Sequence, residues 1–170
     1  MNKEIEHIFR NSNSPDELFD TFRKAITHHI SDIELYKILL ANPVLSGEEL
    51  KMYTEHLSKV FSENAFDLFV WTGRIFSNLS SDYERMEDSI SYFVKAIYKN
   101  PQECEPYLRL LQLYNYEINI PTNSVILEVA ESFSDKVKNK RLIYDNLAKL
   151  YERKGDSEKA MEYKRLSSLS

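Results

Sequence analysis

Glycine, proline and cysteine are scarce in this chain of 170 residues, which contains three, five and one of them. An average composition would give about twelve glycines in a chain of this length. The scarcity excludes collagen-like sequence and argues against β-architectures with many tight turns. Gly47, Gly73 and Gly155 lie too far apart to form a glycine-rich loop, so neither a dinucleotide-binding fingerprint nor a Walker-type phosphate loop is present.

The chain also has fewer basic than acidic residues, 22 Lys and Arg against 27 Asp and Glu, which gives a formal net charge of −5. Such a chain lacks the field that attracts a phosphate backbone, so we expect no nucleic-acid partner and interpret the basic run at 136–141 as a helix end and loop. The single Cys104 cannot form an internal disulfide, which fits a reducing compartment. Because neither a signal peptide nor an 18-residue apolar stretch is present, we expect a cytoplasmic protein without membrane contact.

Start signals for helices recur in the first part of the chain. Ser14–Glu17, Ser31–Glu34 and Ser46–Glu49 each have the pattern of a capping box, in which a serine and an acidic residue satisfy each other's backbone amides. Behind the first of these, apolar residues recur at helical spacing, and no segment has the pattern of a convincing strand. The sequence therefore predicts an all-α fold, with about four helices in an N-terminal segment of residues 1–62.

Two columns of aromatic residues repeat from residue 66 onward. Apolar residues cover most of the circumference of the helices expected near 66–79, 107–116 and 141–151, which predicts that these helices are buried on more than one side. The early aromatic residues of these helices are Phe69, Tyr107 and Tyr144, and the later ones are Phe76, Tyr114 and Tyr151. Both columns are spaced by 38 and then 37 residues, which indicates a helical repeat.

The repeat resembles the tetratricopeptide family, whose hairpins follow aromatic-x-x-Leu-Gly-x-x-Tyr, then Ala-x-x-x-Phe, then Pro. The last unit carries the matching residues Tyr144, Leu147, Ala148, Tyr151, Gly155 and Ala160. The unit at about 66–101 carries Phe69, Gly73, Phe76, Phe93, Ala96 and Pro101. It has about four extra residues around Leu79–Asp82, and the middle unit matches poorly over Pro121–Phe133.

This resemblance covers roughly residues 66–170 and implies a right-handed superhelical stack of antiparallel helical hairpins. We expect three such hairpins in residues 63–170, with the N-terminal segment 1–62 packing on the array. In the family, the first helix of each hairpin lines a concave face that usually holds a peptide or protein segment.

The period aligns candidate binding residues in four columns on that face. They are Asp67, Glu105 and Leu142; Val70, Leu108 and Asp145; Arg74, Gln112 and Lys149; and Asn78, Tyr116 and Arg153. Within each helix these residues are three or four positions apart, so they share one side. We expect a non-enzymatic scaffold or adaptor without a cofactor, which holds a partly acidic segment through Arg74, Lys149 and Arg153. The carboxylate clamp of some family members is absent, because Val70, Glu105 and Leu142 stand at its leading positions.

An enzymatic alternative rests on Arg23 followed by His28 or His29. This spacing resembles the arginine–histidine element of the HEPN ribonucleases, an all-helical family, and implies phosphodiester cleavage at a dimer cleft. In that case Arg23→Ala would abolish cleavage of RNA and leave the fold intact. However, His29 continues the apolar spacing of Phe22 and Ile26, which favours a histidine packed on the core side.

Two further hypotheses concern metal binding and self-association. Glu4 and His7 have the spacing of one half of a carboxylate-bridged metal site, but the second Glu-x-x-His motif is missing, so we expect no metal. The chain could form a homodimer through its N-terminal helices or the end of the array. The last helix expected, at Ser157–Leu169, is polar enough to cap the array itself, which favours a monomer.

Overall fold

A computed structural model describes residues 2–78, 83–117 and 120–170, and the regular structure within these ranges is entirely helical. The α-helices are α1 (Asn2–Asn11), α2 (Pro15–Thr27), α3 (Ile33–Leu40), α4 (Gly47–Val60), α5 (Ala65–Asn78), α6 (Tyr83–Lys99), α7 (Glu105–Gln112), α8 (Pro121–Phe133), α9 (Lys140–Lys154) and α10 (Ser157–Ser168). The all-α prediction is confirmed for these residues, and so are four helices in residues 1–62. The extra residues predicted around Leu79–Asp82 lie outside the described ranges.

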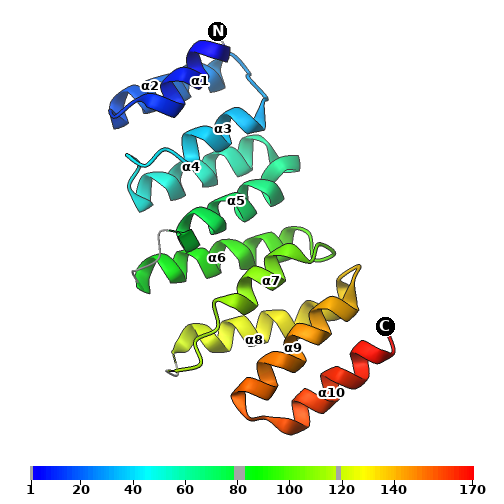
Figure 1. The fold of residues 1–170 in the computed structure, drawn as a ribbon. Coiled ribbons are helices and arrows are strands. Elements are labelled where there is room, and N and C mark those ends of the chain that lie inside the picture. Colours follow the sequence, from blue (N-terminus) through cyan, green and yellow to red (C-terminus); the bar gives the residue numbers. More distant parts are fainter. Residues whose placement is uncertain (1, 79–82, 118–119) are drawn as a thin grey trace.

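The helices are stacked into an elongated array, with the two termini at opposite ends (Figure 1). The accessible surface is 9628 Å², whereas a compact monomer of 20.1 kDa exposes about 8,700 Å². The buried apolar side chains form two clusters, one mainly from α1–α5 and the other mainly from α6–α10. Each helix therefore packs on near neighbours in the sequence. None of the described helices is long and apolar enough to cross a membrane.

Side-chain caps fix the starts of several helices. Ser46 forms a complete capping box at α4, because its Oγ accepts a hydrogen bond from the Glu49 amide and the Glu49 carboxylate accepts one from the Ser46 amide. The Ser46 hydroxyl also donates to the Glu49 carboxylate at 2.6 Å, and this hydrogen bond, together with that from the Ser46 amide, lowers the pKa of Glu49. At α2, the Oγ of Ser14 accepts from the amide of Glu17. The cap of α3 is Asp32, one residue later than the capping box that the sequence predicts.

In the α5/α6 hairpin, one tyrosine of the second helix lies between two aromatic rings of the first. Tyr92 of α6 has its ring centroid 6.1 Å from that of Phe69 and 5.9 Å from that of Phe76. The Phe76 ring is nearly parallel to the tyrosine ring, at 12°. Burial raises the pKa of Tyr92, with the Glu55 carboxylate as a further cause. We call this three-ring arrangement the aromatic lock.

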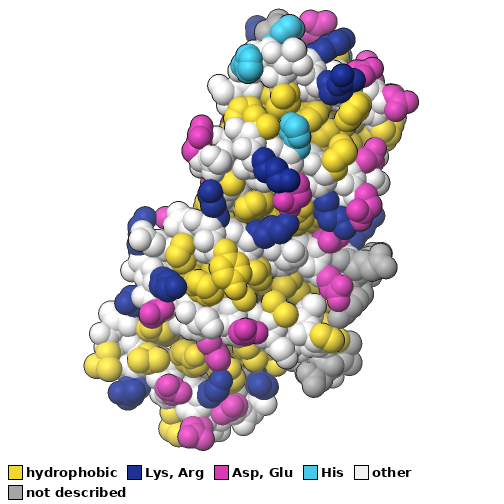
Figure 2. Space-filling view, turned by 180° about the vertical axis from the view of Figure 1, so that it is seen from behind, with side chains coloured by type: hydrophobic (Ala, Val, Ile, Leu, Met, Phe, Trp, Pro, Cys, Tyr) yellow, Lys and Arg dark blue, Asp and Glu magenta, His cyan; other side chains and the backbone are white. Residues whose placement is uncertain are grey.

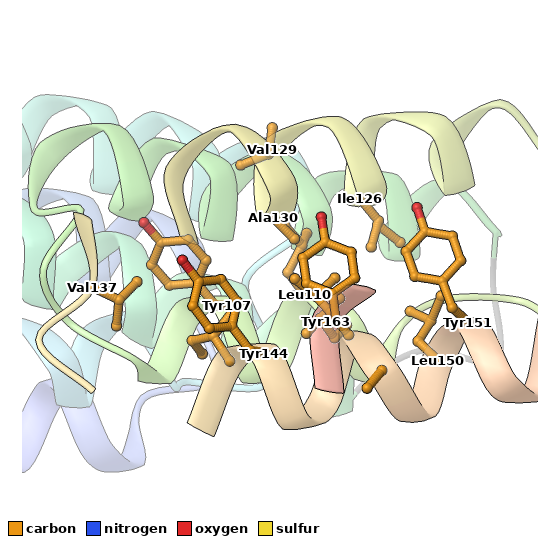
Figure 3. Packing of buried hydrophobic residues seen from close by; sticks show 14 of the residues in the cluster. Tyr107, Leu110, Ile126, Val129, Ala130, Val137, Tyr144, Leu150, Tyr151 and Tyr163 are labelled. Carbon is orange, nitrogen blue, oxygen red and sulfur yellow. The ribbon is translucent and has the colours of Figure 1, made fainter. Parts of the chain in front are cut away.

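The α9/α10 hairpin repeats this lock. Tyr163 of α10 lies between Tyr144 and Tyr151 of α9, with centroid distances of 6.0 and 5.8 Å and an angle of 6° to the Tyr151 ring (Figure 3). Phe69 and Tyr144 are 75 residues apart in the sequence, but Tyr92 and Tyr163 are only 71 residues apart. The difference of four residues equals the insertion that the sequence predicts between the helices of the earlier hairpin.

The middle pair, α7 and α8, departs from this pattern. The sequence predicts a helix to residue 116, but α7 ends at Gln112. The side-chain amide of Asn123 pairs with both backbone groups of Asn115, at 2.9 and 2.8 Å, and so offers the chain an alternative to helical hydrogen bonds. Tyr107 is fully buried and donates its hydroxyl to the Pro101 carbonyl at 2.9 Å. The segment Pro121–Phe133 forms a helix in spite of its poor match to the family pattern.

The end of α2 contradicts the expectation of a packed His29. α9 ends at Gly155, whose φ is 84°, and α2 ends in the same left-handed way at His29, whose φ is 54°. The amide of Ile30 then donates to the Ala25 carbonyl at 3.1 Å, which completes a Schellman motif. Because the helix stops at Thr27, its apolar periodicity does not extend to His29, and this side chain is exposed.

The first helix of the α5/α6 hairpin approaches the second closely at Gly73. A Cβ atom at this position would lie 2.8 Å from Cε1 of Phe93, which is fully buried. Ser89, also fully buried, donates its hydroxyl to the Gly73 carbonyl at 2.9 Å. The close packing of α5 on α6 depends on this small residue, because the Phe93 ring leaves no room for a side chain.

We expect Gly73→Ala to lower the free energy of unfolding by about 1–3 kcal/mol, because the added methyl must displace the Phe93 ring. Urea denaturation measures the change. Gly47→Ala is the matched control, since its Cβ would meet only Phe76 at 3.6 Å, an ordinary contact. The control should stay within about 0.5 kcal/mol of wild type. Equal stability of the two variants would contradict the close approach.

We also expect cooperative unfolding in alkali. Burial raises the pKa of Tyr36, Tyr53 and Tyr151 to about 12, and it also raises the pKa of Tyr92, Tyr107 and Tyr163. The folded state binds these protons more tightly than the unfolded state, whose tyrosines titrate near pH 10. The stability that these groups contribute is therefore complete below about pH 10 and is lost as the pH rises through 12.

Tyrosine absorbance and helical circular dichroism, recorded together against pH, test this expectation. The six tyrosines with raised pKa values should ionise only as the helical signal falls. The chain has 11 tyrosines, so ionisation of more than five while the helices remain intact would contradict it.

Candidate functional site

Two contacts join residues of the predicted columns. The Nε of Arg74 on α5 donates to Glu105 on α7 at 2.7 Å. The guanidinium of Arg153 on α9 lies 3.9 Å from the ring centroid of Tyr116, which follows α7. Arg74 and Glu105 belong to different columns, whereas Tyr116 and Arg153 belong to one, so only the second contact lies within a predicted column. Because Arg74 and Glu105 are partly exposed, their ion pair contributes at most about 1 kcal/mol and acts mainly to position the two side chains.

The other predicted residues divide into exposed and packed ones. Those open to solvent are Asp67, Asn78, Gln112, Leu142 and Lys149.

The packed residues form the second predicted column. Val70 is only 6% exposed, so its place in the binding face is wrong: α5 packs against α3, α4 and α6, and this side chain is covered. Leu108 is half-buried against the apolar cluster. Asp145 accepts a hydrogen bond from Ser167 of α10. Val70 is thus covered, whereas Leu108 and Asp145 contact other parts of the fold and stay partly exposed.

A groove between α3 and α5 adjoins this face, and sequence reasoning missed it. It consists of two adjoining cavities of about 300 and 330 Å³ that share Ala41 and Trp71. The indole of Trp71 is held in place, because its Nε1 donates to the Lys37 carbonyl at 3.0 Å. Further lining residues are Ile38, Pro43, Arg74, Ile75 and Asn78. The single tryptophan of the chain, Trp71, was the one sign of this groove in the sequence. Because α3 lies outside the repeat, the sequence does not show that α3 packs beside Trp71.

The groove is apolar at its centre and mainly basic at its edges. Arg10, Lys37 and Arg74 are among its lining residues, together with Glu34. Lys37 pairs with Glu34 at 2.6 Å, and Arg10 pairs with Glu6 at 2.8 Å. Arg74 pairs with Glu105 in turn, so each of these cations already has a carboxylate partner, which an approaching carboxylate would have to share.

The residues of the ribonuclease hypothesis lie elsewhere, on α2 and just after it. Arg23 and His28 line one surface depression with Asp20, and His29 is exposed beside the end of the helix. That these groups cleave RNA stays a prediction. An RNA-cleavage assay that compares the wild type with Arg23→Ala tests it.

The described ranges contain no group of three His, Cys, Asp or Glu side chains placed to hold a metal ion. His7, one of the two residues of the incomplete metal motif, has its Nδ1 3.1 Å from the side-chain nitrogen of Asn11.

Comparison with known proteins gives no relative for this chain: no protein-family model, no curated protein and no solved structure matches it.

Proposed function

We propose that this protein is a non-enzymatic adaptor, a right-handed tetratricopeptide-like stack that holds a partly acidic segment of a partner protein. The segment lies along the face of α3, α5, α7 and α9. The observation that carries this proposal is the pair of contacts between successive first helices, Arg74 with Glu105 and Tyr116 with Arg153. They join side chains far apart in the sequence into one continuous surface.

The tetratricopeptide-like arrangement is supported by the aromatic lock. The hairpins α5/α6 and α9/α10 are the most extensively packed helix pairs among the described residues, and both contain the lock. They are also the two units whose sequences match the family pattern best. In such an array, each hairpin buries its apolar side against the next and leaves its first helix facing the concave side.

The chemistry of the face suits an extended segment with both acidic and apolar residues. Lys149 is exposed on α9, and Arg153 is held over the Tyr116 ring one turn further along. The groove between α3 and α5, which Trp71 lines, offers an apolar surface at the other end of the same face. A surface already fixed by packing loses little conformational entropy on binding, so the partner's affinity is not reduced by ordering of this chain.

Reversal of two charges tests this proposal. We expect Lys149→Glu with Arg153→Glu to lose proteins that the wild-type chain retains from a native lysate, because carboxylates of the partner would meet like charge. Arg74 is left unchanged, since a glutamate there would face Glu105 and disturb α5 and α7. Quantitative mass spectrometry of the retained proteins gives the result, and thermal melting shows that the variant is folded.

The matched control is Lys99→Glu with Arg165→Glu, which makes the same change in charge at exposed positions of the second helices α6 and α10. This control should retain the wild-type partners. Retention of the same proteins by both double variants would show that the proposed face is not the site. Loss of the wild-type partners from both double variants would show that the change in net charge alone abolishes retention.

A further inference from the structure

A second groove lies between α2 and α4, helices that do not line the proposed face. Its floor is formed by Phe22 and Tyr53, which are 5% and 1% exposed and have ring centroids 4.8 Å apart. Its rims include Phe19 and Met52, which are 42% and 46% exposed, and His56 also lines it. The groove has a volume of about 350 Å³. Figure 2 shows apolar side chains gathered beside a histidine in the upper part of the molecule.

The seams between the other second helices are bridged by side chains. The bridging pairs are Glu55–Lys95 between α4 and α6, Tyr98–Phe133 between α6 and α8, and Glu131–Lys159 between α8 and α10. Between α2 and α4 the bridging contacts are aromatic, since the Phe22 ring lies 4.8 Å from that of Tyr53 and 5.4 Å from that of His56. No ion pair joins these two helices, both of which are described in full, so the groove between them is apolar.

One edge of this groove is basic. The guanidinium of Arg23 lies 5.9 Å from the ring centroid of Phe19 and so stands at the rim. Lys24 and His28 continue the edge into the adjoining depression, which also contains Asp20. In a chain with a net charge of −5, this edge attracts carboxylates toward an apolar cleft.

We propose that the groove between α2 and α4 binds an amphipathic helix of a partner protein, with apolar side chains one turn apart and carboxylates along one flank. A cleft between two helices has the shape that such a helix fills. Phe19 and Met52 come from opposite sides of the cleft and would contact the apolar residues, with the flexible Met52 adapting to their shape. The carboxylates would meet Arg23 and Lys24. This site is independent of the face proposed above.

The test uses the full chain and a fluorescent synthetic helix of about four turns, with leucines at i, i+3, i+4 and i+7, glutamates on one flank and alanines elsewhere. Fluorescence anisotropy should show saturable binding. Met52→Glu should weaken it by about tenfold or more, because a carboxylate would enter the apolar contact. Arg23→Glu should weaken it as well, and Met52→Leu should preserve it. Met161→Glu is the control, since Met161 of α10 is 65% exposed and lies outside the groove.

Several results would overturn the proposal. They are absence of binding by the wild-type chain, equal binding of a peptide with lysines in place of glutamates, and unchanged binding by a folded Met52→Glu variant. Self-association of the wild-type chain in sedimentation velocity that Met52→Glu abolishes would assign the groove to a second copy instead. The Lys149→Glu, Arg153→Glu variant should bind the peptide like wild type, so failure of the adaptor face and failure of this groove are distinguishable.

Discussion

The aromatic lock is the interaction on which the arrangement of the array depends. An isolated helical hairpin cannot bury its apolar side, so its two helices must be aligned before the next hairpin can stack on them. In α5/α6 and in α9/α10, a tyrosine of the second helix enters between two rings of the first, with distances that agree within about 0.1 Å. Each ring pair adds about 0.5–1.5 kcal/mol to the free energy gained from burial alone. The lock therefore fixes the register of the hairpin as well as its stability.

A fixed register has a consequence for binding. When α5 and α9 are held in the same way against their second helices, residues at the same repeat position face the same side. Arg153 contacts Tyr116, which stands at the same predicted repeat position, and Arg74 reaches Glu105, which belongs to a different column. The groove between α2 and α4 has a different origin. There the contacts of Phe22 with Tyr53 and His56 join the two helices, and no ion pair crosses between them, so the cleft that they leave is apolar.

The sequence predicts the parts of this structure that depend on periodic spacing. The spacing places Phe69 with Tyr144 and Phe76 with Tyr151, and these rings have matching contacts in the two locks, whereas Tyr114 lies beyond the end of α7. Spacing does not show which side chains a neighbouring helix covers, so Val70 was placed on the face although it is buried. It also does not show where a helix stops: His29 takes a left-handed conformation, and Asn123 replaces the helical partners of Asn115. Both grooves involve helices of the first 62 residues, where no repeat shows which helices are neighbours.

In an open stack, hairpins contact only their neighbours and present one long face. Small-angle X-ray scattering from the monomer tests this arrangement most directly. A compact domain of 170 residues has a radius of gyration of about 15 Å. The stack predicts a clearly larger radius and a distance distribution with a long tail. A radius near the compact value with a symmetric distribution would contradict the stack and the continuous face that depends on it.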